Sequence, residues 1–405
     1  MKTETPHILP SRRNRVQRIG SSVTKRFLSQ DDCSVERNVY QMLDGTGLTP
    51  ALIEANESRI VTEYLDGPLL FDEMEKALDD PDRQSELFDL FFHWSDMFYR
   101  RTGLILGDSN FRNFILANDR LFGLDFETSR PGCPAEDIAW QAAMLASLRP
   151  AFSPERIRTT RRFLARAPES IYGDPQEILS FLPEAFRVIC ERRGTLLDTT
   201  AYGLIESTLE VAACVLAGGR SSRMGKDKRR LSLRGTSFLE AAQLAIELYS
   251  DKYLSLSADD PMIARPGFEI ARDTIEAAGP IAGITRALHA ARQPWVLFLP
   301  CDMPLLDALL LDELVCHRRQ DTDALLFTER GELRTFPLLL RTAAAAPVFE
   351  EAFARGDLKL RKILQAHLRT EEIEATDCGC YQDHALSNIN TMDDYERLQN
   401  IAQTE

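Results

Sequence analysis

The sequence of 405 residues lacks an apolar run of the roughly 18 residues that would be needed to cross a bilayer. Its first 18 residues contain no apolar core of a secretory signal. Its eight cysteines are scattered, and only Cys378 and Cys380 lie close together, which forms neither a disulfide framework nor a zinc motif. These absences predict a cytoplasmic protein with no membrane span, in which most cysteines are small buried side chains.

The sequence also lacks the excess of positive charge that is typical of nucleic-acid-binding proteins. It has 48 Lys and Arg residues against 62 Asp and Glu residues, so its net charge is −14. Binding to a duplex needs a net basic face, and we therefore expect no nucleic-acid partner. The apolar share of 44% is ordinary for a globular protein and is sufficient for more than one core.

The pattern of apolar residues changes near residue 205. Residues 1–18 are polar and basic and are expected to fray at the extreme end. Residues 19–65 predict short strands around one helix, and residues 71–192 are mostly helical. Beyond residue 205, apolar strands alternate with helices, which indicates a Rossmann-like α/β domain with a mostly parallel sheet. The predicted strands are Leu209–Ala217, Lys252–Ser257, Trp295–Leu299 and Ala324–Thr328. We therefore predict a small two-lobed α+β domain at residues 1–205 and an α/β domain at residues 206–405.

The first strand of the second half, Leu209–Ala217, runs directly into Gly218-Gly-Arg-Ser-Ser-Arg-Met-Gly-Lys-Asp-Lys228. Glycines at this position let backbone N–H groups approach phosphate oxygens closely. From Arg220 to Arg234 there are seven basic residues and one acid, a compact cationic patch that suits a triphosphate. The loop is neither a Walker A motif nor the GxGxxG motif of dinucleotide-binding proteins.

With its flanking residues, this segment reads LAGGxSxRMGxDK and resembles the signature of the molybdenum-cofactor guanylyltransferase family, and more broadly that of sugar-phosphate nucleotidyltransferases. Three later segments follow in the family's order. They are Asp273 with Gly279-Pro-Ile-Ala-Gly-Ile284, then Pro300-Cys-Asp-Met-Pro304, and finally Ser387-Asn-Ile-Asn-Thr-Met392. The resemblance spans about residues 210–400 and departs at Ser257, where the family often has Asn, and at Met392, where it has Pro.

The resemblance implies a nucleotidyltransferase that moves a nucleoside monophosphate, GMP from GTP, to molybdopterin or another phosphate acceptor and releases pyrophosphate. Asp302 would hold Mg²⁺ and act in catalysis together with Lys228. The implied nucleotide contacts are Leu216, Ala217, Gly218, Gly219, Arg223, Lys228 and Asp273, and Asn388 and Asn390 would lie near the acceptor. From the residues alone, Asp302 follows an apolar strand and lies between two prolines, which suits a metal-binding carboxylate.

The first half contains a second arrangement, Gly107-Asp-Ser-Asn-Phe-Arg-Asn113 followed by Asp125-Phe-Glu127. This order resembles the protein-kinase-like fold, in particular its lipopolysaccharide-kinase and aminoglycoside-phosphotransferase branch, over residues 10–200. The resemblance implies ATP as the ligand, Asp108 as the catalytic base, Asn113 and Asp125 as Mg²⁺ ligands, and a Lys25–Glu36 pair that positions the phosphates. It departs at Leu106, where the family has His, and in a glycine-rich loop that is reduced to Ile19-Gly-Ser-Ser22.

Three functions stay open at this point. The protein is a molybdenum-cofactor guanylyltransferase fused to a kinase-like domain, or a bifunctional enzyme that phosphorylates a small alcohol and couples the product to a nucleotide. In the third alternative, a non-catalytic kinase-like module binds a partner for the transferase. The RMGxDK and GPIAGI segments favour the cofactor family over the sugar-phosphate enzymes.

Overall fold

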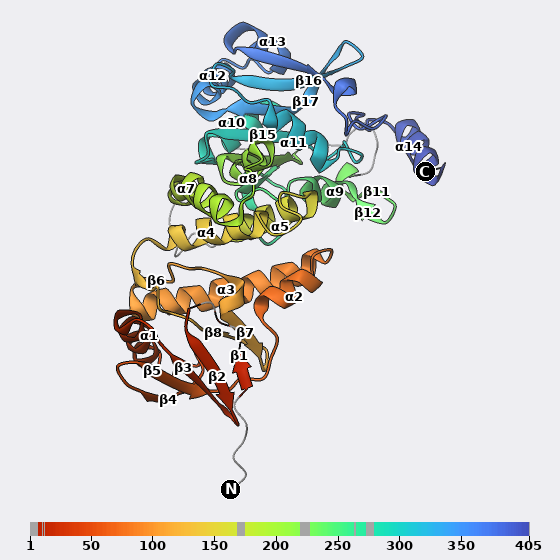
Figure 1. Cartoon of the computed structure of the whole chain (residues 1–405). Helices are drawn as coiled ribbons and strands as arrows, with labels where there is room; N and C mark the ends of the chain where they lie inside the picture. Colours follow the sequence, from red (N-terminus) through yellow and green to blue (C-terminus); the bar gives the residue numbers. More distant parts are fainter. Residues whose placement is uncertain are drawn as a thin grey trace. The chain divides into compact units, whose positions relative to one another are not determined.

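The computed structural model describes residues 7–9, 11, 13–167, 175–218, 227–262, 265–272 and 279–404. The chain divides into two compact units, Met1–Asp198 and Thr199–Glu405 (Figure 1). The second unit begins with helix α8 (Thr199–Glu210), which is followed directly by strand β10 (Val211–Leu216). Within this unit α8 contacts helix α11 (Ala308–Cys316), so the division precedes α8, whereas a boundary at residue 205 would cut the helix.

The first unit begins with a five-stranded antiparallel sheet in the order β1-β2-β3-β5-β4. Its strands are β1 (His7–Leu9), β2 (Arg15–Ile19), β3 (Ser22–Arg26), β4 (Leu52–Ala55) and β5 (Arg59–Glu63). Helix α1 (Gln30–Met42) connects β3 to β4 and begins at Ser29, whose side chain accepts a hydrogen bond from the Asp32 N–H. The extreme N-terminal end, where fraying is expected, lies outside the described residues, and β2 pairs with both β1 and β3.

The rest of the first unit is mostly helical and surrounds an aromatic core. Its helices are α2 (Leu70–Lys76), α3 (Pro81–Thr102), α4 (Pro134–Ala146), α5 (Pro154–Ala165) and α7 (Pro175–Arg193), with the 3-10 turn η1 (Phe111–Asn113). Its short strands are β6 (Leu104–Ile105), β7 (Phe114–Ala117), β8 (Arg120–Gly123) and β9 (Arg130–Pro131). Phe126 is fully buried and packs against Tyr40 of α1 and against Trp94 and Phe98 of α3. This packing fixes the segment that carries Asp125 and Glu127.

The second unit has a seven-stranded sheet in the order β14-β13-β10-β15-β17-β16-β18. Its strands besides β10 are β13 (Lys252–Leu256), β14 (Glu269–Arg272), β15 (Trp295–Pro300), β16 (Ala324–Glu329), β17 (Glu332–Arg341) and β18 (Thr370–Glu374). β17 pairs antiparallel with both of its neighbours, and the other pairs are parallel. The predicted α/β architecture of this half is therefore confirmed.

Helices cover both faces of this sheet. The remaining elements are α9 (Phe238–Ala245), α10 (Pro280–Ala290), α12 (Thr342–Ala354), α13 (Leu360–His367), α14 (Met392–Thr404), the short strands β11 (Ser232–Leu233) and β12 (Thr236–Ser237), and the 3-10 turns η2 (Lys228–Arg230) and η3 (Ala375–Asp377). Alternate residues of β10 face opposite cores: Val215 packs on the side of α9 and α11, and Cys214 on the side of α10 and α12. Because β14, β13, β10 and β15 are parallel neighbours, their carboxyl ends meet at one edge of the sheet, where open α/β sheets bind ligands.

None of the described helices is both long enough and apolar enough to cross a membrane.

Candidate functional site

Three residues from separate segments meet beyond the sheet edge of the second unit. The Lys228 ammonium donates one hydrogen bond to Asp302 Oδ2, at 3.1 Å, and another to Asn390 Oδ1, at 2.9 Å. The Lys228 and Asp302 side chains are only 17% and 19% exposed. Water therefore screens this pair less than it screens a surface ion pair. The structure thus brings together a cation, a carboxylate and an amide that the sequence predicted for one site.

Backbone hydrogen bonds explain why these residues converge. Asp302 lies just past the end of β15, where the Cys301 N–H donates to the carbonyl of Leu216 at 3.2 Å. The Ile389 N–H donates to the carbonyl of Asp302 at 2.9 Å, which brings the following residue, Asn390, to Lys228. Asn388 is exposed on the same segment. The loops after β10 and β15 and the segment before α14 are therefore joined at the site.

The thiol of Cys301, next to Asp302, is largely buried. Burial, with the adjacent Asp302 carboxylate, raises the pKa of Cys301 to about 12. The thiol is therefore protonated at neutral pH.

The structure explains why glycine occupies two positions of the predicted GPIAGI segment. Gly279 has a φ of +63° just before α10, a conformation that favours glycine, and Pro280 then begins the helix. A Cβ atom on Gly283 would lie 2.3 Å from Ser255 Oγ, so this glycine lets α10 pack directly against β13. The motif therefore sets the distance between α10 and the sheet.

The structure describes only part of the predicted nucleotide loop. The Ala217 N–H donates to the carbonyl of Ser255 at 3.0 Å, and Leu216 accepts from Cys301, so both backbones are fixed at the sheet edge. Gly218 is the last described residue before the loop. The predicted contacts Gly219, Arg223 and Asp273 lie outside the described residues.

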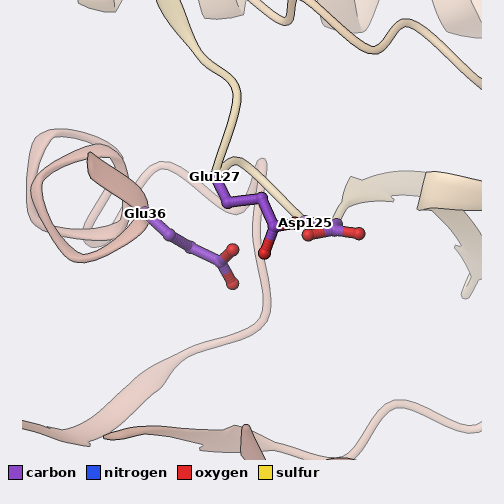
Figure 2. A group of neighbouring side chains, drawn as sticks. All are labelled: Glu36, Asp125 and Glu127. Atoms are coloured by element: carbon purple, nitrogen blue, oxygen red, sulfur yellow. The ribbon is translucent and has the colours of Figure 1, made fainter. Parts of the chain in front are cut away.

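In the first unit, four charged side chains meet beside α1. The Lys25 ammonium lies 2.7 Å from Glu36 Oε2, 2.6 Å from Asp125 Oδ1 and 3.1 Å from Glu127 Oε2. Figure 2 shows Glu36 reaching from its helix toward the segment that carries Asp125 and Glu127. One carboxylate oxygen from each acid lies within 4.8 Å of the others. The predicted Lys25–Glu36 pair is therefore formed. Lys25 also contacts Asp125 and a third acid, Glu127, which is not among the predicted site residues.

Burial decides the electrostatics of this group. The Glu36 side chain is 3% exposed, and burial raises its pKa to about 7, although Lys25 acts in the opposite direction. Burial also works to lower the pKa of Lys25, but the carboxylates of Glu36 and Asp125 outweigh it, so this pKa lies above its ordinary value. Lys25 therefore stays charged, and its charge favours the ionised form of Glu36, which burial disfavours.

Hydrogen bonds also hold the loop that carries Asp108 and Asn113. The Leu106 and Gly107 N–H groups donate to the two carboxylate oxygens of Asp137, at 2.6 Å and 3.0 Å. Asn113 donates through Nδ2 to the carbonyl of Asp108 at 3.3 Å, and its own carbonyl accepts from the Leu124 N–H at 2.8 Å. This last bond connects the loop to the residue just before Asp125.

The strand register places the turn Ile19–Ser22, which the kinase resemblance equates with the glycine-rich loop, away from Lys25. Ile19 pairs with Ser22 and Val16 with Lys25, so the Gly20 turn lies three residues from Lys25, about 10 Å along the strand. Near Lys25 lies the beginning of β2, because Val16 pairs with Lys25. Just before β2, Asn14 Nδ2 donates a hydrogen bond to Glu127 Oε2 at 2.6 Å. Sequence reasoning missed Asn14, because no motif marks it and only the strand register reveals its position.

The second unit matches a known family. Residues 213–371 match the model of the MobA-like NTP transferase domain. The molybdenum cofactor guanylyltransferase of Pseudomonas entomophila (strain L48) is 31% identical over 181 residues, which are 44% of this chain and 92% of that protein. The chain belongs to this family through its C-terminal unit. The molybdenum cofactor guanylyltransferase of Pseudomonas syringae pv. syringae (strain B728a) is 34% identical over 181 residues, 44% of this chain and 87% of that protein.

Among solved structures, molybdopterin-guanine dinucleotide biosynthesis protein A from Archaeoglobus fulgidus is similar to this chain, with 22% identity and a TM-score of 0.42. The similarity covers 48% of this chain and 100% of that one. The resemblance predicted for the C-terminal half is confirmed, and this half is a nucleotidyltransferase of the molybdenum cofactor guanylyltransferase type. Lys228 and Asp302 lie inside the matched residues, and Asn390 lies beyond them.

Proposed function

We propose that the C-terminal unit transfers GMP from GTP to the phosphate of molybdopterin, in the cytoplasm, and releases pyrophosphate. The observation that carries this proposal is the contact of Lys228 with Asp302 and Asn390 at the carboxyl edge of the sheet, in a chain of this family. The relatives are named guanylyltransferases, which supports GTP as the donor.

The chemistry follows from the side chains at this edge. An oxygen of the acceptor phosphate attacks the α-phosphorus of GTP, and the bond to the bridging oxygen of pyrophosphate breaks. Negative charge grows on the phosphate oxygens in the transition state, and the Lys228 ammonium offsets it. No residue forms a covalent intermediate in this scheme, which agrees with the protonated thiol of Cys301.

The donor set at this edge fits Mg²⁺. Asp302 supplies a partly shielded carboxylate oxygen, and Mg²⁺ characteristically binds one or two carboxylates together with substrate phosphates. When bound, Mg²⁺ would act as a Lewis acid that neutralises phosphate charge.

The test is to incubate the full chain with Mg²⁺, molybdopterin and each of the four NTPs in turn, and to measure pyrophosphate. We expect release with GTP that depends on molybdopterin, and a product whose mass equals that of molybdopterin plus GMP. Release with another NTP instead would replace the proposed donor, and release with none of them would contradict the function.

We also propose that the N-terminal unit has a kinase-like fold and binds Mg·ATP. The observation that favours this second function is the Lys25–Glu36 ion pair beside Asp125. In protein kinases a Lys–Glu pair positions the ATP phosphates, while an Asp and an Asn hold Mg²⁺. Asn113 donates through its amide nitrogen to the carbonyl of Asp108, which leaves the amide oxygen as the atom that would bind the ion.

In this scheme Asp108, which is exposed, accepts the proton of a substrate hydroxyl that attacks the γ-phosphorus of ATP. The phosphorylated alcohol would then be an acceptor for the C-terminal unit. The alternative is a module that binds a partner without catalysis. Calorimetry with Mg·ATP on the full chain and on its Asp125→Ala variant tests the binding. Loss of one binding event in the variant supports it, whereas identical titrations overturn it. ATP turnover then separates a kinase from a binding module.

A further inference from the structure

We propose that Arg229 is a positioning residue of the nucleotidyl-transfer site. It joins the loop after β10 to the loop after β13 and thereby holds Lys228 where its ammonium reaches Asp302. This inference rests on the proposed function of the C-terminal unit and assigns a role to a residue beyond the predicted site.

The Arg229 guanidinium forms hydrogen bonds with two carboxylates, those of Asp227 and Asp260. Its Nε lies 2.9 Å and 3.1 Å from the two oxygens of Asp227, and its Nη2 lies 2.8 Å from Asp227 Oδ2. Its Nη1 donates to the carboxylate of Asp260. The side chains of Arg229 and Asp260 are only 17% and 11% exposed. A planar guanidinium can bond two carboxylates in fixed directions at once, and a lysine ammonium cannot reproduce this geometry.

Asp260 also connects Arg229 to the end of β14. Its Oδ1 accepts from the Met262 N–H at 3.0 Å, which shapes the loop after β13. Its backbone carbonyl accepts from Arg272 Nη1 at 2.6 Å, and Arg272 is the last residue of β14. The strands β14, β13 and β10 are neighbours in the sheet, so Arg229 and Arg272 together connect the loops at three adjacent strand ends.

In the sequence, Lys228 lies between Asp227 and Arg229, which form an ion pair with each other. Asp227 accepts from the Arg229 N–H at 3.1 Å and begins the three-residue turn η2. So short a 3-10 turn has little stability of its own, and the Asp227–Arg229 pair supplies the restraint. The Lys228 backbone is thereby fixed, although its long side chain is flexible. Placement matters here, since an error of 1 Å in a catalytic group can cost about a hundredfold in rate.

Arg229 does not itself supply charge to the substrate, because its guanidinium is already engaged. Its hydrogen bonds hold the pKa of Asp227 below the usual value, so the pair remains ionised at neutral pH. The two carboxylates around the guanidinium offset its positive charge. Arg229 therefore acts through Lys228.

The next residue provides a matched control. Arg230 carries the same charge on the same turn, but its side chain is 85% exposed and its Nε lies 3.9 Å from Asp227. Arg230→Ala therefore removes one positive charge without breaking the connection between the loops.

The experiment compares Arg229→Ala, Arg229→Lys and Arg230→Ala, each with Lys228 present and with Lys228→Ala. Pyrophosphate release with GTP gives kcat and KM. We expect Arg229→Ala to lower kcat by about 10-fold to 100-fold and Arg229→Lys to restore little of it. Arg230→Ala, which removes an exposed charge from the same cationic patch, should lower kcat by clearly less than Arg229→Ala does. In the Lys228→Ala background, Arg229→Ala should change kcat by less than about twofold, since residues that act as one unit are not additive. A full effect of Arg229→Ala in that background, or an equal loss in Arg230→Ala, would overturn the proposal.

A second readout does not depend on turnover, so the proposal stays testable if the proposed function fails. Acetylation of the Lys228 amine in the folded protein, followed by mass spectrometry, measures how firmly its ammonium is held. Labelling should rise several-fold in Arg229→Ala and remain at the wild-type level in Arg230→Ala, with both variants folded by circular dichroism. Equal labelling of Lys228 in the two variants would overturn the positioning role.

Discussion

Lys228 and Asp302 are 74 positions apart in the chain, yet the ammonium of one lies 3.1 Å from a carboxylate oxygen of the other. The parallel strands β10 and β15 are neighbours, and each of these residues follows the carboxyl end of its strand. Sheet topology therefore creates the contact, and it brings Lys228, the last residue of the LAGGxSxRMGxDK segment, to the Asp302 carboxylate. This pair is the centre of the proposed nucleotidyl-transfer site.

Asp137→Ala should destabilise the N-terminal unit by about 2–4 kcal/mol, because the Leu106 and Gly107 N–H groups lose their acceptor at a largely buried place. Urea unfolding of the full chain, followed by the fluorescence of its tryptophans, measures the change. Asp137→Asn keeps one acceptor oxygen and should fall between wild type and Asp137→Ala. Equal stability of the alanine variant and wild type would show that this carboxylate does not support the Asp108 loop.

Lys25→Met should strengthen the dependence of the stability of the N-terminal unit on pH through Glu36. Burial already raises the pKa of Glu36 to about 7, and loss of Lys25 removes the charge that opposes this effect. A carboxyl whose pKa is higher when folded than when unfolded, where it is about 4.3, stabilises fully below that value and less as pH rises through the folded pKa. The variant should therefore lose stability from pH 5 to pH 8.

The control for this prediction is Lys25→Met combined with Glu36→Gln, which cannot ionise at this position. Thermal unfolding at several pH values compares the two proteins. The pH dependence of the single variant relative to the double variant should be clear, and parallel curves for the two would contradict the assigned role of Glu36.

Gly283→Ala should destabilise the C-terminal unit by about 1–3 kcal/mol, because the new methyl group would lie 2.3 Å from Ser255 Oγ and would push α10 away from β13. Adding Ser255→Ala removes that oxygen and should recover part of the loss. Chemical unfolding of the single and double variants measures both effects. No loss in Gly283→Ala would mean that α10 tolerates a larger separation from the sheet.

The central strands of the C-terminal sheet could be predicted because both of their faces are buried. β10, β13, β15 and β16 are nearly continuous apolar runs, and the sequence predicts all four. Edge strands carry no such pattern: β18 reads Thr-Glu-Glu-Ile-Glu and becomes a strand because it pairs with β16. β17 is an interior strand with a buried run of three leucines, but it is not predicted, because Pro337 within it argues against a central strand.

The candidate sites divide in the same way. Lys228, Asp302 and Asn390 lie in motifs whose residue types reveal their chemistry, and so do Lys25 and Asp125. The contacts of Arg229 with Asp260 and of Asn14 with Glu127 join residues that no motif relates, and only the positions of the loops bring them together.

The central claim is that Asp302 and Lys228 form a nucleotidyl-transfer site, and pyrophosphate release by Asp302→Asn with GTP, Mg²⁺ and molybdopterin tests it most directly. The asparagine can still accept from Lys228 but removes the negative charge that suits a metal, so we expect kcat to fall on the order of a thousandfold with an unchanged Tm. Asp307→Asn is the matched control, because it removes the same charge nearby and asparagine still caps α11. Activity of Asp302→Asn within a few-fold of that control would contradict the claim.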